Sequence, residues 1–355
     1  MRLSREPNPE PFRIEPTFSP RIWGARSLAP LFPEKTNLAE PIGEAWLTDV
    51  KCRVATGPLV GKTLGEAWRE MPVHWRGSRY AEAGDFPLLA KFIFPTDKLS
   101  IQVHPDDAYA SVHEKAAGGR GKTEMWHVVS AEPGAQVLVG LKPGVTREQF
   151  LAALTNHTLE DCFVAYDAHA GDTFFIPAGT PHTIGPGVVL CEVQQYSDLT
   201  YRVYDYGRVD AQGRPRELHV EKALEVIRFG KSQRGKVPRS PLPIERAYRS
   251  LLTACPYFAA ERWELLASSR ATALRERFEV LIILQGTGYI HWSGSPLMYK
   301  RGQCWFVPAS LGAFSLQPEQ KSAVVRAYVP DLAVLVEELQ KSAMPTSSIS
   351  QSVFA

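Results

Sequence analysis

Cysteine is scarce in this sequence, and none of its cysteines forms a close pair. The five cysteines stand far apart, at positions 52, 162, 191, 255 and 304, and no Cys-x-x-Cys motif occurs. This spacing argues against a structural zinc site and a disulfide framework, and it indicates a reducing compartment. The sequence also lacks an apolar run long enough to span a bilayer, and the segment Met1–Pro7 lacks the hydrophobic core of a signal peptide. We therefore expect a cytoplasmic protein with no membrane partner.

The sequence also has nearly equal numbers of basic and acidic residues. Lysine and arginine number 40 against 38 aspartate and glutamate residues, which gives a formal net charge of +2. The sequence contains no basic cluster of the kind that binds nucleic acid, so we expect no nucleic-acid partner. The 355 residues, with 44% hydrophobic and 22% charged side chains, are typical of a globular protein of two domains.

The most informative stretch begins with an alternating segment around Gln102 and His104. Apolar and polar residues alternate there as in a half-buried strand, so these two side chains project to the same face. Pro105 ends that strand, and a second strand carries Glu124 on its face. An amide, an imidazole and a carboxylate on neighbouring strands can supply three metal ligands.

A fourth candidate ligand is His182, which follows a short apolar strand and a corner rich in proline and glycine. Proline and glycine on both sides of the corner fix the backbone that presents this imidazole. A mixed nitrogen and oxygen ligand set of this kind suits zinc, manganese or iron(II). His127 lies on the opposite strand face from Glu124, and we interpret it as structural.

Three separated motifs carry a resemblance to a known family: Gln102-x-His104-Pro105, Lys122-x-Glu124 and Pro177-Ala178-Gly179-x-x-His182. The sequence resembles the type I phosphomannose isomerases of the cupin superfamily, in their shorter bacterial form, from about Phe18 to Val329. The segments Gly43–Trp46 and Pro87–Lys91 resemble the same family. The resemblance is specific, because several separated motifs occur in the family's order.

Short strands with turn signals throughout favour small β-barrels, and the resemblance implies two of them. We expect a mainly β fold of two tandem cupin (jelly-roll-like) barrels with a few peripheral helices. Residues 1–230 would form the metal-binding catalytic domain with helical insertions, residues 231–243 a linker, and residues 244–330 a second barrel. Leu311 and Gly312 stand where the second barrel would need a histidine, so we expect that barrel to be degenerate. Residues 331–355 would form a short helix and a loose tail.

Helices are expected at a few places outside the barrels. Thr63 to Glu66 and Thr146 to Gln149 fit capping boxes, in which the first side chain and the last satisfy free backbone groups at a helix start. Residues 220, 223, 224 and 227 are apolar at helical spacing, which predicts an amphipathic helix.

The resemblance implies a metal-dependent isomerase that interconverts mannose 6-phosphate and fructose 6-phosphate through an enediol intermediate. The implied ligands of one divalent metal, expected to be Zn²⁺ although other divalent metals are possible, are Gln102, His104, Glu124 and His182. The implied catalytic residues are Arg202, Lys122 and Glu192, and the implied substrate-binding residues are Arg208 and Asp198. A guanidinium binds phosphate with paired hydrogen bonds, and Arg208 stands where the longer enzymes have a phosphate-binding lysine. Lys122 or Glu192 would move the proton, directly or through a metal-bound water.

Two other classes of protein fit parts of the pattern. An iron(II) oxygenase uses two histidines and one carboxylate with open positions, and a sugar-sensing cupin would bind the sugar without turnover. The isomerase is the interpretation that we carry forward, because Lys122, Arg202 and Arg208 form a cationic set suited to a phosphorylated sugar. Thr183 and Ile184 follow His182 where larger members carry an aromatic residue, so the preferred aldose stays open. The oligomeric state is open as well.

Overall fold

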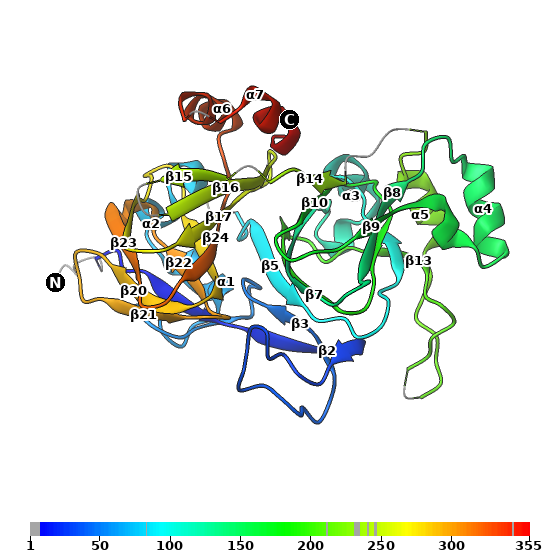
Figure 1. Cartoon of the computed structure of the whole chain (residues 1–355), viewed down its shortest axis with the longest axis horizontal. Helices are drawn as coiled ribbons and strands as arrows, with labels where there is room; N and C mark the ends of the chain where they lie inside the picture. The colour runs from blue at the N-terminus through cyan, green and yellow to red at the C-terminus, as the bar shows by residue number, and fades with distance from the viewer. Residues whose placement is uncertain are drawn as a thin grey trace.

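The structure, a computed structural model, describes residues 8–82, 84–210, 212–230, 235–239, 241–244, 247–342 and 344–355. Within these residues, strands dominate and form four sheets, arranged in two halves that lie side by side (Figure 1). The named strands pair antiparallel throughout, and the helices lie at the periphery of the sheets. The expected mainly β class is therefore confirmed.

The first half consists of a larger and a smaller sheet. The larger sheet has the order β14 (Lys236–Val237), β10 (Thr173–Ile176), β7 (Glu124–Ala131), β12 (Val188–Gln195), β5 (Leu88–Ile93), β3 (Ile42–Trp46) and β2 (Thr17–Ala25). The smaller sheet has the order β13 (Tyr201–Tyr204), β6 (Ile101–Val103), β11 (His182–Ile184), β8 (Gln136–Leu141) and β9 (Phe163–Asp167). Buried side chains of both sheets, such as Trp126 and Leu190 from one and Val139 from the other, share one core between them.

The second half repeats this arrangement of a larger and a smaller sheet. The larger sheet has the order β15 (Pro241–Ile244), β16 (Ala247–Ala254), β17 (Ala259–Leu265), β24 (Ser322–Tyr328), β19 (Glu279–Gln285), β22 (Cys304–Val307), β1 (Phe12–Glu15) and β4 (Arg53–Val54). The smaller sheet has the order β18 (Ser269–Thr272), β23 (Ala313–Pro318), β20 (Thr287–His291) and β21 (Leu297–Lys300). None of the four sheets closes on itself among the described residues, so each half is a pair of open sheets.

Helices connect and cover the sheets. The α-helices of the described residues are α1 (Leu64–Glu70), α2 (Val73–Arg76), α3 (Asp107–His113), α4 (Arg147–Thr155), α5 (Val220–Val226), α6 (Leu332–Lys341) and α7 (Thr346–Ser352). Short 3₁₀ turns are η1 (Ser78–Tyr80), η2 (Lys115–Ala117), η3 (Leu159–Cys162) and η4 (Ala309–Leu311). Both expected capping boxes are confirmed: Thr63 with Glu66 begins α1, and Thr146 with Gln149 begins α4.

The N-terminal segment joins the two halves. Strand β1 pairs with β22, where Phe12 lies opposite Phe306 and the two rings stack 4.7 Å apart. Trp68 of α1 packs edge-on against Phe278, with 5.2 Å between ring centroids. One large apolar cluster includes buried residues from strands of both halves. The described part of the chain therefore has a core that is continuous across the two halves.

The C-terminal segment is ordered by its own packing. The expectation of a loose tail is wrong, because residues 346–352 form α7 and Ile349 is buried beside α6. The Phe354 ring stacks on Phe175 of β10, with 4.0 Å between centroids. Met344, Ile349 and Val353 pack in one apolar cluster with α6, and these contacts together with the Phe354 stack explain the docking of this polar segment.

The expected linker falls partly outside the described residues, which exclude 231–234 and 240. Its described residues include β14, which pairs with β10, and most of β15, which pairs with β16. The chain thus passes from an edge of the first half to an edge of the second within a few residues.

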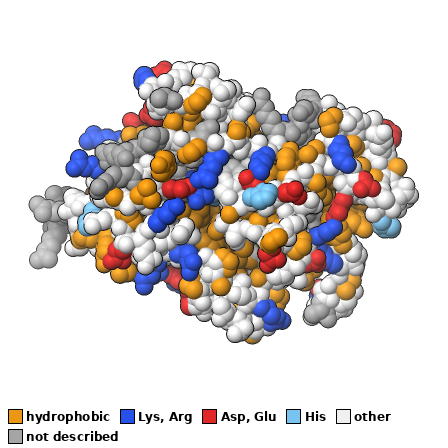
Figure 2. All heavy atoms as spheres, viewed as in Figure 1, with side chains coloured by type: hydrophobic (Ala, Val, Ile, Leu, Met, Phe, Trp, Pro, Cys, Tyr) orange, Lys and Arg blue, Asp and Glu red, His pale blue; other side chains and the backbone are white. Residues whose placement is uncertain are grey.

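Among the described residues, no helix has the length and apolar character required to cross a membrane. The face seen in Figure 2 carries basic and acidic side chains interspersed with hydrophobic ones.

Candidate metal centre and active site

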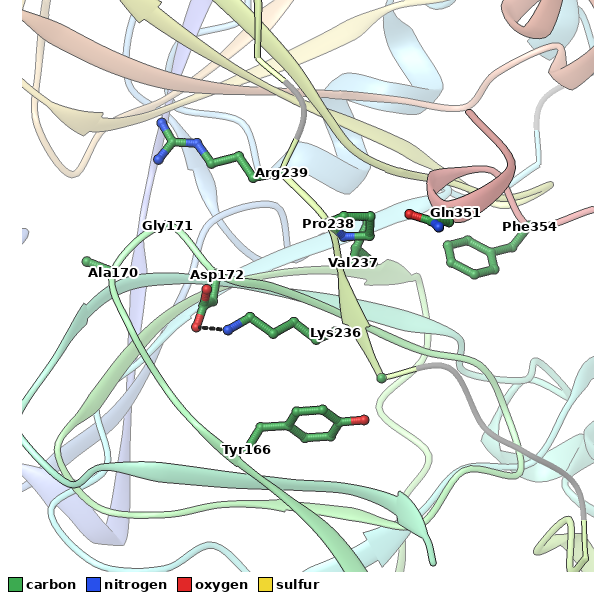
Figure 3. A pocket seen from close by; sticks show the side chains of 11 residues that line it. Tyr166, Ala170, Gly171, Asp172, Lys236, Val237, Pro238, Arg239, Gln351 and Phe354 are labelled. Carbon is green, nitrogen blue, oxygen red and sulfur yellow. Dashed lines mark hydrogen bonds and ion pairs between the residues drawn. The ribbon is translucent and has the colours of Figure 1, made fainter. Parts of the chain in front are cut away.

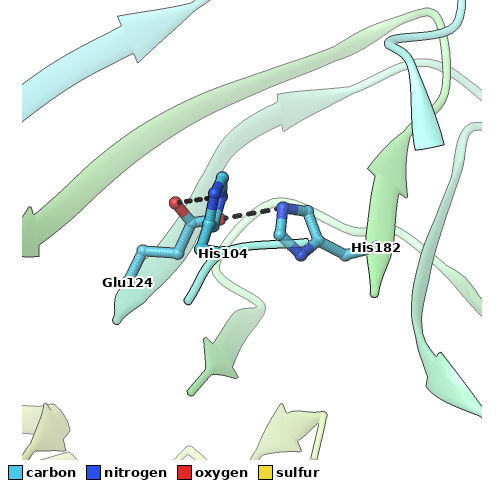
Figure 4. Close-up of side chains that lie close together, drawn as sticks. All are labelled: His104, Glu124 and His182. Atoms are coloured by element: carbon cyan, nitrogen blue, oxygen red, sulfur yellow. Dashed lines mark ion pairs between the residues drawn. The ribbon is translucent and has the colours of Figure 1, made fainter. Parts of the chain in front are cut away.

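Three of the predicted metal ligands converge inside the first half. His104 follows β6, Glu124 begins β7 and His182 begins β11, so the three come from both sheets (Figure 4). The Glu124 carboxylate lies between the two imidazoles, 3.5 Å from Nε2 of His104 and 3.3 Å from Nε2 of His182. One ligand atom from each residue lies within 4.8 Å of the others. This spacing allows the three side chains to hold one cation together.

Strand pairing brings the fourth predicted ligand to the same place. In the ladder between β6 and β11, Gln102 stands opposite His182, and the Gln102 amide nitrogen lies 3.3 Å from Nε2 of that histidine. The corner before His182 is fixed to the other ligand strand, because the Gly179 N–H donates to the His104 carbonyl at 2.8 Å. Gly179 has a φ of +82°, and a Cβ there would lie 2.8 Å from the Val226 carbonyl oxygen, so only glycine fits without strain.

The orientation of both imidazoles is set by backbone carbonyls. Nδ1 of His104 lies 2.9 Å from the Leu199 oxygen, and Nδ1 of His182 lies 2.8 Å from the Thr180 oxygen. A carbonyl oxygen only accepts, so Nδ1 of each neutral ring carries the proton and Nε2 keeps its lone pair. Both lone pairs therefore lie on the Glu124 side, which is the arrangement that histidine ligands of metals adopt.

Several buried polar atoms of this cluster have no hydrogen-bond partner among the described residues and could bind a cation. Nε2 of His104 and both carboxylate oxygens of Glu124 are buried without a hydrogen-bond partner in the described part of the chain. Buried polar atoms are normally paired, and a buried carboxylate without compensation is costly. Lys122 supplies part of the compensation, since its Nζ lies 2.9 Å from Glu124 Oε2. The remaining lone pairs fit a divalent metal ion of the kind that binds nitrogen and oxygen ligands.

The protonation states of the cluster also suit a metal. Burial lowers the pKa of His104 to about 3, with the Lys122 charge acting in the same direction and Glu124 opposing it. Burial likewise lowers the pKa of His182. Burial alone would raise the pKa of Glu124, but Lys122 and His104 lower it well below its usual range. At neutral pH the set therefore comprises neutral imidazoles and an ionised carboxylate, the forms that bind metals.

A cavity of about 320 Å³ opens beside this cluster. Five of the residues predicted from the sequence line it: Gln102, Lys122, Glu192, Asp198 and Arg202. The volume lies within the range of small-molecule sites in proteins. The structure thus places one predicted metal ligand, Gln102, and all three predicted catalytic residues, Lys122, Glu192 and Arg202, around one space.

Lys122 and Glu192 lie close to the metal cluster from the side of the larger sheet. The Glu192 carboxylate accepts a hydrogen bond from Nε1 of Trp126 at 3.0 Å. Burial, with the Glu124 charge, raises the pKa of Glu192 to about 7, while Lys122 and Lys91 oppose the rise. Burial alone would lower the pKa of Lys122, but the carboxylates of Glu124, Glu192 and Asp198 outweigh it and raise that pKa. Both side chains line the cavity.

The two predicted arginines have different positions. Arg202 on β13 stands opposite Gln102 of β6, so its side chain lies beside the ligand strand and lines the cavity. Arg208 does not line the cavity. It binds Asp205 at 2.6 Å and Asp97 at 3.3 Å, and it also donates to the Lys98 carbonyl. The expected direct contact between Arg208 and the substrate is therefore not what the geometry favours.

Four further charged residues line the cavity that sequence reasoning did not assign to the site: Arg21, Glu44, Lys91 and Arg216. Lys91 is 2% exposed and lies 3.4 Å from Asp198, 3.8 Å from Glu192 and 3.9 Å from Glu44. A lysine inside an otherwise apolar buried strand is a signal that could have revealed it, because lysine is almost never fully buried without a partner. No comparable local signal marks Arg216.

His127 takes no part in this cluster. It is fully buried, with Nδ1 3.0 Å from the Thr173 hydroxyl and Nε2 3.0 Å from an Arg262 nitrogen. The structural interpretation of this histidine agrees with these contacts.

A larger cavity lies elsewhere, between the two halves. Its volume is about 630 Å³, and its walls include the Asp172–Lys236 ion pair at 2.7 Å and the Phe354 ring (Figure 3). None of the predicted site residues lines it. The chemistry that the sequence predicts therefore belongs to the smaller cavity.

The fold and the site define a class: a mainly β protein with a buried metal-type cluster of two histidines, a glutamate and an amide beside a charged cavity. The model of the phosphomannose isomerase type I catalytic domain matches residues 12–125. The chain is 34% identical over 319 residues to the mannose-6-phosphate isomerase ManA of Bacillus subtilis, covering 87% of this chain and 96% of that protein. The chain belongs to the family of type I phosphomannose isomerases.

Solved structures agree with this assignment. The crystal structure of the mannose 6-phosphate isomerase from Bacillus subtilis has a TM-score of 0.81 to this chain at 29% identity, and the match covers 89% of this chain and 99% of that one. A mannose 6-phosphate isomerase bound with zinc and yttrium has a TM-score of 0.68 at 16% identity, covering 90% of this chain and 99% of that one. The second likeness shows the fold alone.

Proposed function

We propose that this protein is a metal-dependent aldose–ketose isomerase that interconverts mannose 6-phosphate and fructose 6-phosphate. The observation that carries the proposal is the convergence of His104, Glu124 and His182 beside a cavity lined by basic and acidic side chains. The mannose-6-phosphate isomerase from Bacillus subtilis, at 34% identity over nearly its whole length, supports the same substrate.

The metal would be held by four side chains, Gln102, His104, Glu124 and His182. Nε2 of His104, which is unpartnered among the described residues, and the Glu124 carboxylate, whose charge Lys122 compensates only in part, support one divalent ion per chain, and we propose Zn²⁺. When bound, the cation would stabilise negative charge developing on the C1 and C2 oxygens of the sugar.

The chain's own residues would move the proton and hold the substrate. Isomerisation carries a proton between C2 and C1 of the open-chain sugar, which one base can remove and return. Lys122 and Glu192 both line the cavity and are the proposed bases, and the choice between them is testable by comparing Lys122→Met with Glu192→Gln. Arg202 would stabilise the enediolate charge, and Asp198 would help to position the sugar.

A coupled assay of purified protein with mannose 6-phosphate, following fructose 6-phosphate, tests the proposal. We expect turnover that saturates with mannose 6-phosphate and is much weaker with unphosphorylated mannose. A panel of other aldose phosphates tests the preferred sugar, which Thr183 and Ile184 leave open. Bound phosphosugar without turnover in the zinc-loaded protein would favour the sugar-sensing alternative.

One observation favours a second candidate, an iron(II) oxygenase. Two histidines and one carboxylate are the ligand set of that class, and His104, Glu124 and His182 match it. The basic side chains of the cavity favour a phosphorylated sugar instead. Oxygen uptake by iron-loaded protein, without isomerase activity, would support the oxygenase.

We also propose that the two halves are tandem cupin-like barrels, with the boundary near residues 231–243. In the first half, Glu124 begins β7 opposite Ile176, just before Pro177. In the second half, Glu279 begins β19 opposite Val307, just before Pro308. The match in register supports a repeated unit.

The second unit would have no metal site. Ala313, one residue beyond the Leu311 and Gly312 expected from the sequence, begins β23 at the place where His182 begins β11. Glu279 binds the Arg326 guanidinium, with 2.7 Å between Glu279 Oε2 and Arg326 Nε. An arginine thus compensates the acid that corresponds to Glu124.

We place the protein in the cytoplasm, since its five cysteines remain free thiols.

A further inference from the structure

We propose that Arg216, oriented by Asp205, binds the phosphate group of the substrate together with Arg202. The inference rests on the proposed isomerase function and names the residue that selects a phosphorylated sugar. Asp205 would be a positioning residue, since it touches the arginine and not the substrate. Arg208, the arginine that the sequence suggested for this contact, would instead support the segment that carries Arg216.

The cavity has two unlike walls. On the side of the larger sheet, every cation has an acidic partner: Arg21 pairs with Glu44 at 2.6 Å, and Lys122 pairs with Glu124 at 2.9 Å. Lys91 lies within 4 Å of three carboxylates on that side. On the opposite side, Arg202 and Arg216 line the cavity without forming an ion pair to any acidic residue that lines it. Arg216 has its acidic partner, Asp205, outside the cavity lining, and Arg202 forms no ion pair within the described part of the chain, so the positive charge that faces the cavity is concentrated on the side of these two arginines.

Asp205 holds the Arg216 guanidinium through two of its nitrogens and leaves the third nitrogen available. Its Nε donates to Asp205 Oδ2 at 2.7 Å, and its Nη2 donates to Asp205 Oδ1. Nη1 of Arg216 makes no hydrogen bond in the described part of the chain, and the side chain is 25% exposed. A guanidinium fixed by a carboxylate on one edge presents its remaining donors in a defined plane, which suits a phosphate.

Arg202 adds a second unfilled donor. Its Nη1 donates to the Glu217 carbonyl at 2.8 Å, while its Nε is buried without a hydrogen-bond partner among the described residues. The contact with Glu217 places the backbone next to Arg216 directly against Arg202. Burial and then the Arg216 charge lower the pKa of Arg202, which agrees with two guanidinium groups lying close together. An anion between them would relieve that repulsion.

Arg208 has its donors already occupied. Its Nε binds the Asp205 carbonyl at 3.2 Å, its Nη2 binds the Asp205 carboxylate at 2.6 Å, and its Nη1 binds Asp97 at 3.3 Å and the Lys98 carbonyl. Asp205 is therefore clamped by Arg208 on one side and holds Arg216 on the other. This arrangement fixes the base of the segment formed by residues 205–210 and 212–216, which projects from the first half beneath β13 in Figure 1.

The test compares Arg216→Ala with Arg214→Ala in the zinc-loaded full-length protein. Arg214 lies two residues away, is 72% exposed and pairs with Asp210, so it is a matched control outside the cavity. We expect Arg216→Ala to raise the KM for mannose 6-phosphate by about 10- to 100-fold, the loss expected for charge-assisted hydrogen bonds. Inhibition by inorganic phosphate should weaken to a similar extent, while kcat changes by only a few-fold and bound zinc is unchanged. Arg214→Ala should leave all four quantities at the wild-type values.

Two further variants separate positioning from general damage. Arg216→Lys keeps the charge but loses the fork, so its KM should lie between the wild-type and alanine values. Asp205→Asn should raise KM while the bound zinc stays at the wild-type value, and Asp205→Glu should restore part of the loss. Equal KM values and equal phosphate inhibition in Arg216→Ala and Arg214→Ala would overturn the proposal.

The failure of this inference is distinguishable from failure of the proposed function. If the wild-type protein turned over no mannose 6-phosphate, the isomerase assignment would fall. Calorimetric titration of wild-type and Arg216→Ala proteins with inorganic phosphate would still test the anion site. Weaker binding by the variant supports the site, and equal binding overturns it.

Discussion

Glu124 is the residue on which the proposed metal centre depends most. Its carboxylate is 0% exposed, lies between two neutral imidazoles and also pairs with Lys122. The two histidines are oriented by their own backbone contacts, whereas Glu124 supplies the negative charge that attracts a cation. Removing that charge should therefore affect metal binding more than removing any other single group.

Glu124→Gln keeps the size of the side chain and removes its charge. We expect bound metal to fall from about one ion per chain to a small fraction, and kcat/KM to fall by at least about 100-fold. Metal analysis and the coupled assay on the same sample measure both. Glu337→Gln, on the exposed face of α6, is the control and should keep both values. A fully metallated, active Glu124→Gln protein would contradict the assignment.

Arg202 should act on the substrate and not on the metal. Arg202→Ala removes a guanidinium from the cavity but leaves all four proposed ligands in place. We expect kcat to fall by about 10²- to 10³-fold, as for the loss of a group that stabilises developing negative charge. Metal content should stay near one ion per chain. Unchanged turnover in this variant would remove Arg202 from the mechanism.

At the scale of secondary-structure elements, the ligands depend on the corner between β10 and β11. The Gly179 N–H holds the His104 carbonyl, so this corner links two ligand-bearing segments. The proline, glycine and histidine pattern predicted the corner from the sequence, because it depends on local backbone chemistry. The capping boxes of α1 and α4 were predictable for the same reason.

Gly179→Ala tests the corner against a matched control. Gly179 and Gly134 have nearly equal φ angles, +82° and +80°, but a Cβ at Gly134 meets nothing within 4 Å. Both substitutions carry the cost of a left-handed alanine, and only Gly179→Ala adds the clash with the Val226 carbonyl. We expect Gly179→Ala to lose about 1–3 kcal/mol more unfolding free energy in urea than Gly134→Ala, together with metal affinity. Equal losses of unfolding free energy would show that the close contact between Gly179 and the Val226 carbonyl does not contribute to stability.

Other elements could not be predicted from the sequence, because they depend on contacts distant in the chain. Arg208 matched a family pattern, yet its donors are occupied by Asp97, Lys98 and Asp205. Arg216 lines the cavity from a segment whose next residue, Glu217, accepts a hydrogen bond from Arg202 through its backbone carbonyl. The loose tail was expected from polar composition, which does not reveal a stacking partner in another segment.

At the scale of the whole molecule, the second half contributes stability through a buried ionic network. Glu261 is fully buried and accepts hydrogen bonds from Arg249 at 2.6 and 2.9 Å, from the Tyr328 hydroxyl at 2.6 Å and from Trp263 at 3.0 Å. Burial alone would raise its pKa, but Arg249 and Arg326 outweigh burial and lower that pKa to about 2. Because the apolar core is continuous across both halves, loss of this ionic network would destabilise the first half as well.

The unfolding free energy should therefore fall with acidification in a defined window. A depressed pKa in the folded state contributes stability that is present above the unfolded value of 4.5 and is lost as the pH falls toward about 2. The pKa difference corresponds to about 3 kcal/mol for this group. Urea denaturation between pH 5 and about pH 2 should show a flatter pH dependence in Glu261→Gln than in wild type or Glu337→Gln. Parallel curves in all three proteins would contradict the contribution of Glu261.

The most direct measurement of the central claim is turnover of mannose 6-phosphate before and after chelation, with metal analysis of the same sample. The account predicts that the chelated protein loses both its metal and its activity, and that about one equivalent of zinc restores activity. Glu124→Gln should not recover under the same treatment. Full activity in a protein shown to be free of metal would contradict the account, and so would a zinc-loaded protein that forms no fructose 6-phosphate.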